Sequence, residues 1–205
     1  MTELFVSAFV TFFVIIDPPG CAPIFASLTN GATVAHRRAM AIRSVLIAAG
    51  ILFGFALVGE AFLGALGISL DAFRIAGGIM LFLIALEMVF EKRTERRENR
   101  ANDVMAKNEE DVSIFPMAIP MIAGPGSIAS AMLLTSRSNG TNETLAVFGA
   151  LAAVLLLTMV ALLLAGPLMR LLGYKIEAMI TRLLGVILAA LAAQFVIDGI
   201  KASFT

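Results

Sequence analysis

The chain has 205 residues, of which 60% are hydrophobic and 15% are charged, and its formal net charge is zero. A soluble domain of this size contains about 45–50% apolar and about 25% charged residues, so lipid must cover part of this surface. The neutral balance gives no sign of nucleic-acid binding. Because Cys21 is the only cysteine and His36 the only histidine, the sequence excludes an intramolecular disulfide, a thiolate cluster and a multi-histidine site. We expect a membrane protein without a metal or a cofactor.

Six apolar stretches follow one another, each close to the roughly 20 residues with which a helix crosses about 30 Å of hydrocarbon. They lie at about 4–28, 44–66, 70–90, 112–136, 144–169 and 176–200. The N-terminus lacks the basic segment and cleavage site of a cleaved signal, so the first stretch should remain a membrane helix. The sequence therefore predicts an all-α membrane protein with six transmembrane helices.

Basic residues are unevenly distributed between the connections. Eleven follow the first, third and fifth stretches: Arg37, Arg38, Arg43, Lys92, Arg93, Arg96, Arg97, Arg100, Lys107, Arg170 and Lys175. The opposite side holds Arg137 and Lys201, and Arg74 if its side chain extends outward. Because basic residues are retained in the cytoplasm, we expect a multi-pass protein of the bacterial inner membrane with both termini periplasmic.

Two sequence signatures occur once in each half, in the same order and at nearly equal spacing, which indicates duplication. The pairs are Asp17-Pro-Pro-Gly-Cys21 with Ala123-Gly-Pro-Gly-Ser127, and Arg74-Ile-Ala-Gly77 with Arg182-Leu-Leu-Gly185. Each half contains three spans, and an odd number inverts the second half relative to the first. We therefore expect two inverted three-helix repeats, at 1–90 and 114–205. The charged segment 91–113 between them is interpreted as a frayed cytoplasmic helix or mobile linker without a binding role.

The first span should be broken near its middle. Pro18 and Pro19 remove two backbone donors, and Pro18 disfavours helical geometry at Asp17. The helix should end near Ile16 and restart with Asp17 as its N-cap and Pro18 as its first residue. Gly20 adds backbone freedom at the restart.

The fourth span repeats this design. Gly124-Pro125-Gly126 should break it, after Pro116 and Pro120 have bent its first turns. Unpaired backbone groups cost several kcal/mol in hydrocarbon, so such breaks persist only inside protein or beside a water-filled cavity. A restarting helix also directs free N–H groups at its surroundings, which suits a substrate carboxylate.

These breaks define the candidate solute site. Its predicted members are Asp17, Pro19, Gly20, Cys21, Pro125, Gly126, Ser127 and Gln194. Two alternatives stay open: the breaks could only improve packing, and Asp17 could cap a helix without touching solute or proton.

Other polar residues within the spans have simpler interpretations. Arg74 and Arg182 either extend to the lipid headgroups or pair across the repeat interface, for instance with Glu60 or Glu87. Small residues in the third and sixth spans, such as Gly77-Gly78, should allow close helix contact and place these spans in the interior.

Several motifs are similar to those of one known family. They are Asp17-Pro-x-Gly-x-x-Pro-x-Phe25, Phe73-Arg-Ile-Ala-Gly-Gly78, Pro116-Met-Ala-Ile-Pro120, Ala123-Gly-Pro-Gly-Ser-Ile-Ala129 and Gln194-Phe-Val-Ile-Asp-Gly199. The sequence resembles the MarC family of bacterial and archaeal integral membrane proteins, also described as neutral amino-acid transporters. This resemblance implies six spans, an inner-membrane location and a relation to amino-acid exporters. Many members carry Asn in place of Asp17, which favours capping over an obligatory proton-carrying role.

The leading functional hypothesis is a secondary transporter or exporter of small solutes, with neutral amino acids first among them, that works by alternating access. The expected partners are that solute and the bilayer, not nucleic acid, and the oligomeric state, a homo-oligomer included, is open. An ion or small-solute channel and a non-transporting scaffold are the alternatives. An enzyme is not expected, because the sequence lacks the motifs of intramembrane proteases.

Overall fold

The computed structural model describes residues 2–106 and 111–204, so the predicted linker residue Lys107 lies outside the described part, as do the side chains of Arg170 and Lys175. Within these ranges the chain forms helices and no strand. The elements are α1 (Thr2–Ile16), α2 (Pro18–Leu28), α3 (Val34–Ala65), α4 (Leu70–Val89), α5 (Lys92–Ala106), the π-helical η1 (Ser113–Ile122), α6 (Pro125–Ser136), α7 (Thr141–Leu163) and α8 (Ala165–Ser203). The predicted all-α class is confirmed.

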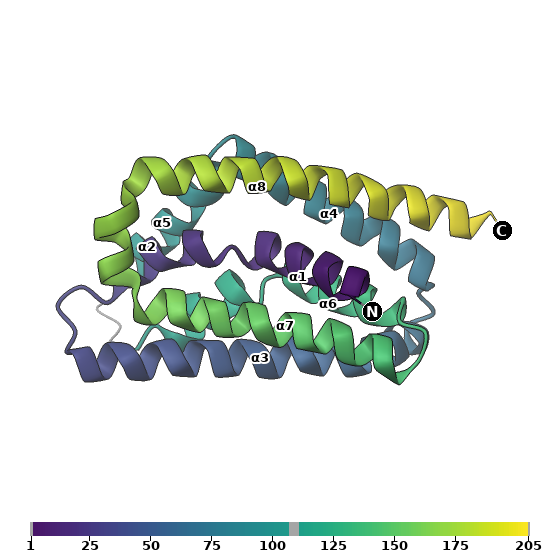
Figure 1. The fold of residues 1–205 in the computed structure, drawn as a ribbon, viewed down its shortest axis with the longest axis horizontal. Helices are drawn as coiled ribbons and strands as arrows, with labels where there is room; N and C mark the ends of the chain where they lie inside the picture. Colours follow the sequence, from purple (N-terminus) through teal and green to yellow (C-terminus); the bar gives the residue numbers. More distant parts are fainter. Residues whose placement is uncertain (1, 107–110, 205) are drawn as a thin grey trace.

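The long helices run side by side along one axis (Figure 1). The two pieces α1 and α2 lie in the centre, between α3 and α7 on one side and α4 and α8 on the other. Both termini lie towards one end, and the α2–α3 turn, α5 and the start of α8 lie at the other. The central position of α1 explains why large side chains such as Phe12 and Ile16 are fully buried.

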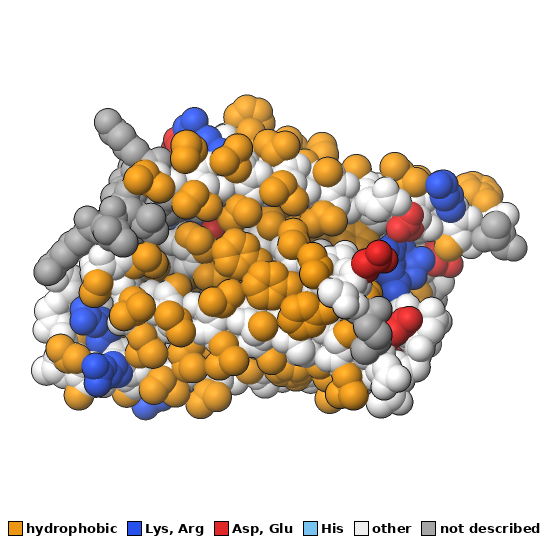
Figure 2. Space-filling model, in the orientation of Figure 1, with side chains coloured by type: hydrophobic (Ala, Val, Ile, Leu, Met, Phe, Trp, Pro, Cys, Tyr) orange, Lys and Arg blue, Asp and Glu red, His pale blue; other side chains and the backbone are white. Residues whose placement is uncertain are grey.

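Five segments of the described chain are long and apolar enough to cross a membrane: Thr2–Leu28, Val34–Ala65, Leu70–Val89, Thr141–Leu163 and Ala178–Ser203. The pair Ser113–Ile122 and Pro125–Ser136, bent by 53°, is a sixth if it is one span. Hydrophobic side chains cover the middle of the visible face, and charged side chains gather at its two ends (Figure 2). This distribution is the one a bilayer requires.

The boundary between the last two long helices differs from the prediction. The stretch expected at 144–169 ends as α7 at Leu163, and α8 begins two residues later and continues for 39 residues. A basic loop was expected before the last span, yet this part of the chain is helical. Its first turns run crosswise at the arginine-rich end before α8 turns along the bundle (Figure 1).

The expectation that the third and sixth spans are interior is wrong. In their most apolar stretches only 28% of α4 and 28% of α8 is buried, against 56% for α1 and α2 together. The small residues instead bring these two helices against each other. A Cβ at Gly78 would lie 2.9 Å from the Ala192 carbonyl oxygen, and one at Gly185 would lie 3.1 Å from the Ala85 carbonyl oxygen. The glycines therefore mark close contact between two helices, not a central position.

Candidate functional site

The first helix break forms as predicted. Asp17 adopts a left-handed conformation with φ 58°, which an Asp tolerates better than most residues. Its Oδ1 accepts a hydrogen bond of 3.2 Å from the Gly20 amide and so caps α2. A Cβ at Gly20 would collide with the Asp17 carboxylate, so this position requires glycine. Capping by Asp17 is therefore confirmed.

The two prolines of this break leave carbonyl groups of α1 without their helical donors. The Ile15 carbonyl would bond to the amide of residue 19, but Pro19 has none. Arg93 replaces it, with Nη2 donating to the Ile15 oxygen at 2.6 Å. The next carbonyl, of Ile16, accepts a contact of 3.4 Å from the buried Cys21 thiol. Side chains thus satisfy the Ile15 and Ile16 carbonyls at the break.

The second break has a different construction. Phe115 and Ile119 have extended backbones within η1, at the two positions that precede Pro116 and Pro120. After this, α6 starts at Pro125 with an extended Gly124 as N-cap, and no side chain caps it. The first amides of α6 therefore lack the side-chain acceptor that Asp17 provides for α2.

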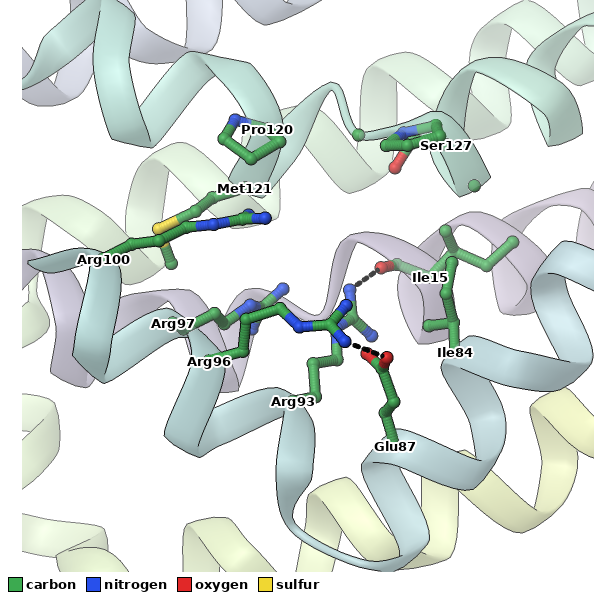
Figure 3. A pocket seen from close by; sticks show the side chains of 13 residues that line it. Ile15, Ile84, Glu87, Arg93, Arg96, Arg97, Arg100, Pro120, Met121 and Ser127 are labelled. Carbon is green, nitrogen blue, oxygen red and sulfur yellow. Dashed lines mark hydrogen bonds and ion pairs between the residues drawn. The ribbon is translucent and has the colours of Figure 1, made fainter.

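A cavity of about 190 Å³ lies between these two breaks. It is lined by Ile15, Ile84, Glu87, Arg93, Arg96, Arg97, Arg100, Pro120, Met121, Gly124, Pro125, Gly126 and Ser127. Figure 3 shows the arginines entering from α5 and Ser127 facing them from the start of α6. Four arginines of α5, which lies in the segment interpreted as a linker, thus form part of the cavity wall.

Three of the four arginines hold α5 in place. The Arg97 Nη1 donates to the Asp17 Oδ2 at 3.0 Å, and both side chains are almost fully buried, with exposures of 7% and 1%. Arg96 pairs with Glu87 at 2.6 Å (Figure 3). Arg93 holds the Ile15 carbonyl. A buried arginine and carboxylate require each other, because either charge alone would be costly to desolvate.

The cavity carries an excess of positive charge. Four arginines face two carboxylates, Asp17 and Glu87, which leaves two uncompensated positive charges. Burial, and after it the neighbouring Arg97, lower the pKa of Arg93 to about 10. An anionic group in the cavity would relieve this repulsion.

The structure brings most predicted site residues together. Pro125, Gly126 and Ser127 line the cavity, while Pro19, Gly20 and Cys21 belong to the first break directly behind it. Gly126 cannot carry a side chain without disturbance, since a Cβ there would lie 2.7 Å from the Ile84 Cδ1. The two breaks thus lie next to each other, and three of the eight predicted residues line the cavity between them.

Gln194 does not join them. Its Nε2 donates to Asp198 Oδ1 at 2.6 Å, and Asp198 pairs with Arg137 at 2.8 Å. The Arg137 guanidinium also lies 4.9 Å from the centre of the Phe195 ring. These residues join the end of α6 to α8 near the termini, at the other end of the bundle from α5 (Figure 1).

The other intramembrane arginines pair with carboxylates outside the cavity lining. Arg74 pairs with Asp71 at 3.3 Å, one helical turn away, and Arg182 pairs with Glu91. Neither contacts Glu60 or Glu87, which had been considered as partners. Within the described residues no three His, Cys, Asp or Glu side chains gather as a metal ion would require.

The sequence interpretation missed the arginines of α5, although a signal was present. Arg93, Arg96, Arg97 and Arg100 are spaced as i, i+3, i+4 and i+7, which places them on one face of a helix. A solvated charged helix has no reason to gather one sign of charge on one face. This spacing could have been interpreted as a binding face.

Comparison with known proteins agrees with this architecture. The family described as MarC family integral membrane protein matches residues 2–204. The chain belongs to the MarC family. A UPF0056 membrane protein of Methanocaldococcus jannaschii is 36% identical over 97% of both chains. The UPF0056 membrane protein YvbG of Bacillus subtilis is 34% identical over 100% of this chain and 97% of its own. YhcE of Escherichia coli is 33% identical over 96% and 91%. No solved structure matches this MarC-family chain.

Proposed function

We propose that this MarC-family protein is a secondary transporter or exporter of small solutes in the bacterial inner membrane, with neutral amino acids as the first class to test. The observation that carries the proposal is the cavity between the two helix breaks. Broken helices at mid-membrane, with irregular backbone beside a cavity, are the usual construction of solute sites in secondary transporters.

The packing pattern supports an inverted repeat. If η1 corresponds to α1, α6 to α2, α7 to α3 and α8 to α4, most of the principal contacts map onto each other. The pair α1–α7 corresponds to η1–α3, α2–α7 to α6–α3, and α2–α8 to α6–α4, while α4–α8 maps onto itself. Such exchange of partners is what a pseudo-two-fold axis produces, and with three spans in each half that axis would lie in the membrane plane. In this proposal the bent pair η1 and α6 is the sixth span.

Alternating access then has a structural basis. The arginine-lined cavity lies at the end of the bundle that carries most basic residues, which we assign to the cytoplasm, with both termini periplasmic. At the opposite end Arg137 and Asp198 hold α6 against α8. Movement of α6 away from α8 would separate this pair and open the cavity to the other side.

The test is solute flux into proteoliposomes, with Ser127→Leu as the blocking variant. Ser127 lines the cavity, so a leucine there would occupy part of its volume, and we expect flux to fall at least tenfold. Ser7→Leu is the matched control, because Ser7 is exposed on α1 and a leucine there faces lipid. Saturable flux with counter-exchange supports a carrier, whereas flux that does not saturate indicates a channel. A folded protein that moves no solute, or an unaffected Ser127→Leu, would overturn the proposal.

A further inference from the structure

The two helix starts at the cavity differ in what their amides face. The start of α2 is capped by the Asp17 carboxylate, which is itself paired with Arg97. The start of α6 has no side-chain cap. Helix starts of this kind bind anions, because free N–H groups and the helix dipole point at the ligand.

Ser127 in the first turn of α6 has an unused hydroxyl. Its side chain lines the cavity, yet the residue is only 2% exposed, and among the described residues its hydroxyl has no hydrogen-bond partner. Figure 3 shows the oxygen directed into the space that the arginines enter. In this position the hydroxyl can bond to water or to a ligand in the cavity.

Arg100 is the arginine of this cavity that has no assigned role. Arg93, Arg96 and Arg97 have the Ile15 carbonyl, Glu87 and Asp17 as acceptors. Arg100 lines the cavity, is partly buried, and has no hydrogen-bond or ion-pair partner within the described residues. A planar guanidinium of this kind suits bidentate binding of a carboxylate.

The same lining has no unpaired carboxylate that could bind a cationic group. The carboxylate of this lining, Glu87, pairs with Arg96, and Asp17 behind the lining pairs with Arg97. A solute ammonium would enter a space with an excess of positive charge and no free carboxylate. The carboxylate of a solute is therefore the group that the lining recognises.

The geometry points to a carboxylate-binding site in this cavity, formed by Arg100, the Ser127 hydroxyl and the first amides of α6, that takes small organic acids at least as readily as the corresponding amino acids. This inference rests on the proposed transport function and specifies its substrate class: the solute carboxylate is required, and its ammonium group is not.

The test is equilibrium binding of radiolabelled L-lactate to the protein in phosphatidylcholine nanodiscs, in competition with L-alanine and L-alaninol. We expect L-lactate to bind at least as tightly as L-alanine, and L-alaninol, which lacks the carboxylate, to bind at least tenfold more weakly. Tight binding of L-alaninol, or of L-alanine but not L-lactate, would overturn the inference. Because no transport is needed for binding, binding without flux would refute the proposed function, and flux without carboxylate dependence would refute this site.

Two variants locate the site. Arg100→Gln should weaken L-lactate binding about tenfold or more, and Ser127→Ala a few-fold. Neither removes an interaction within the described structure, so both should fold. Arg38→Gln is the control, since it removes one exposed positive charge from the same end of the bundle and should leave binding unchanged.

An anionic lipid headgroup offers similar chemistry, so the assay is repeated with phosphatidylglycerol in the nanodisc. Unchanged L-lactate affinity supports a solute site. Loss of L-lactate binding, reversed by returning to phosphatidylcholine, would assign the arginines to lipid and overturn the inference.

Discussion

The two helix breaks use the same residues, proline and glycine, but differ in what closes them. At the first break side chains of the chain itself are the partners: Asp17 caps α2, Arg97 neutralises Asp17, and Arg93 takes the carbonyl that Pro19 leaves without a donor. At the second break no side chain caps α6, and the Ser127 hydroxyl has no partner among the described residues. The comparison suggests that the first break serves stability and the second serves solute.

The largest expected effect concerns the buried ion pair of the first break. Arg97→Gln leaves the Asp17 carboxylate buried without its charge partner and should lower the free energy of unfolding by about 3 kcal/mol. Asp17→Asn keeps an oxygen for the Gly20 amide but takes the carboxylate away from the buried Arg97 guanidinium, so it should also cost about 3 kcal/mol. Denaturant titration in detergent micelles measures both. Small losses for both variants would show that the pair does not close the break.

Next in size is the glycine that the Asp17 cap requires. Gly20→Ala forces a methyl group against the Asp17 carboxylate and should cost about 2 kcal/mol. Gly54→Ala is the matched control, because Gly54 lies within α3 with nothing near its Cβ position. That change should stabilise the protein by about 0.5 kcal/mol. The same unfolding assay applies, and similar values for the two variants would contradict the close contact.

A smaller loss of stability should show that the Arg93 side chain takes the place of a missing backbone donor. Arg93→Gln should cost about 1.5 kcal/mol, since it loses a charged hydrogen bond to the Ile15 carbonyl. Pro19→Ala restores a backbone amide that can bond this carbonyl. In that background Arg93→Gln should cost about 1 kcal/mol less, and a double-mutant cycle measures the difference. Additive losses would mean that Arg93 does not act in place of the missing donor.

The smallest effect on stability should occur at the second break. Ser127→Ala removes a hydroxyl that bonds to nothing in the described structure, so the free energy of unfolding should change by less than about 0.5 kcal/mol. If α6 is open for solute, the same variant should still lower solute flux in proteoliposomes. A large loss of stability without a change in flux would contradict the idea that the first break stabilises the fold and the second binds solute.

What could be predicted from the sequence was largely local. The end of α1, the Asp17 cap and the start of α6 at Pro125 follow from rules that act within a few residues. The role of Arg93 could not be derived in this way, because it depends on α5 folding back onto a carbonyl of α1, 78 residues earlier in the chain.

Two predictions were wrong because the position of a residue along a helix, or the residue types in it, do not specify where that helix or side chain lies within the bundle. Gln194 was assigned to the site because its position along the last span places it inside the membrane. That position does not specify which face of α8 the side chain occupies, and Gln194 in fact bonds to Asp198. Small residues in α4 and α8 indicated close approach correctly. They could not indicate that the closely packed pair lies at the side of the bundle and leaves the centre to α1.

The tight seam between α4 and α8 has a mechanical consequence. Backbone and glycine meet at Gly78, at Gly185 and again at Gly199, whose Cβ would lie 3.1 Å from the Asp71 carbonyl oxygen. Because α4 and α8 are in close contact at three positions along their length, they should move as one rigid unit, although they come from opposite halves of the chain. In the proposed transport cycle α4 and α8 would be the pivot, and the helices far from them, α3 and α7, would move the furthest.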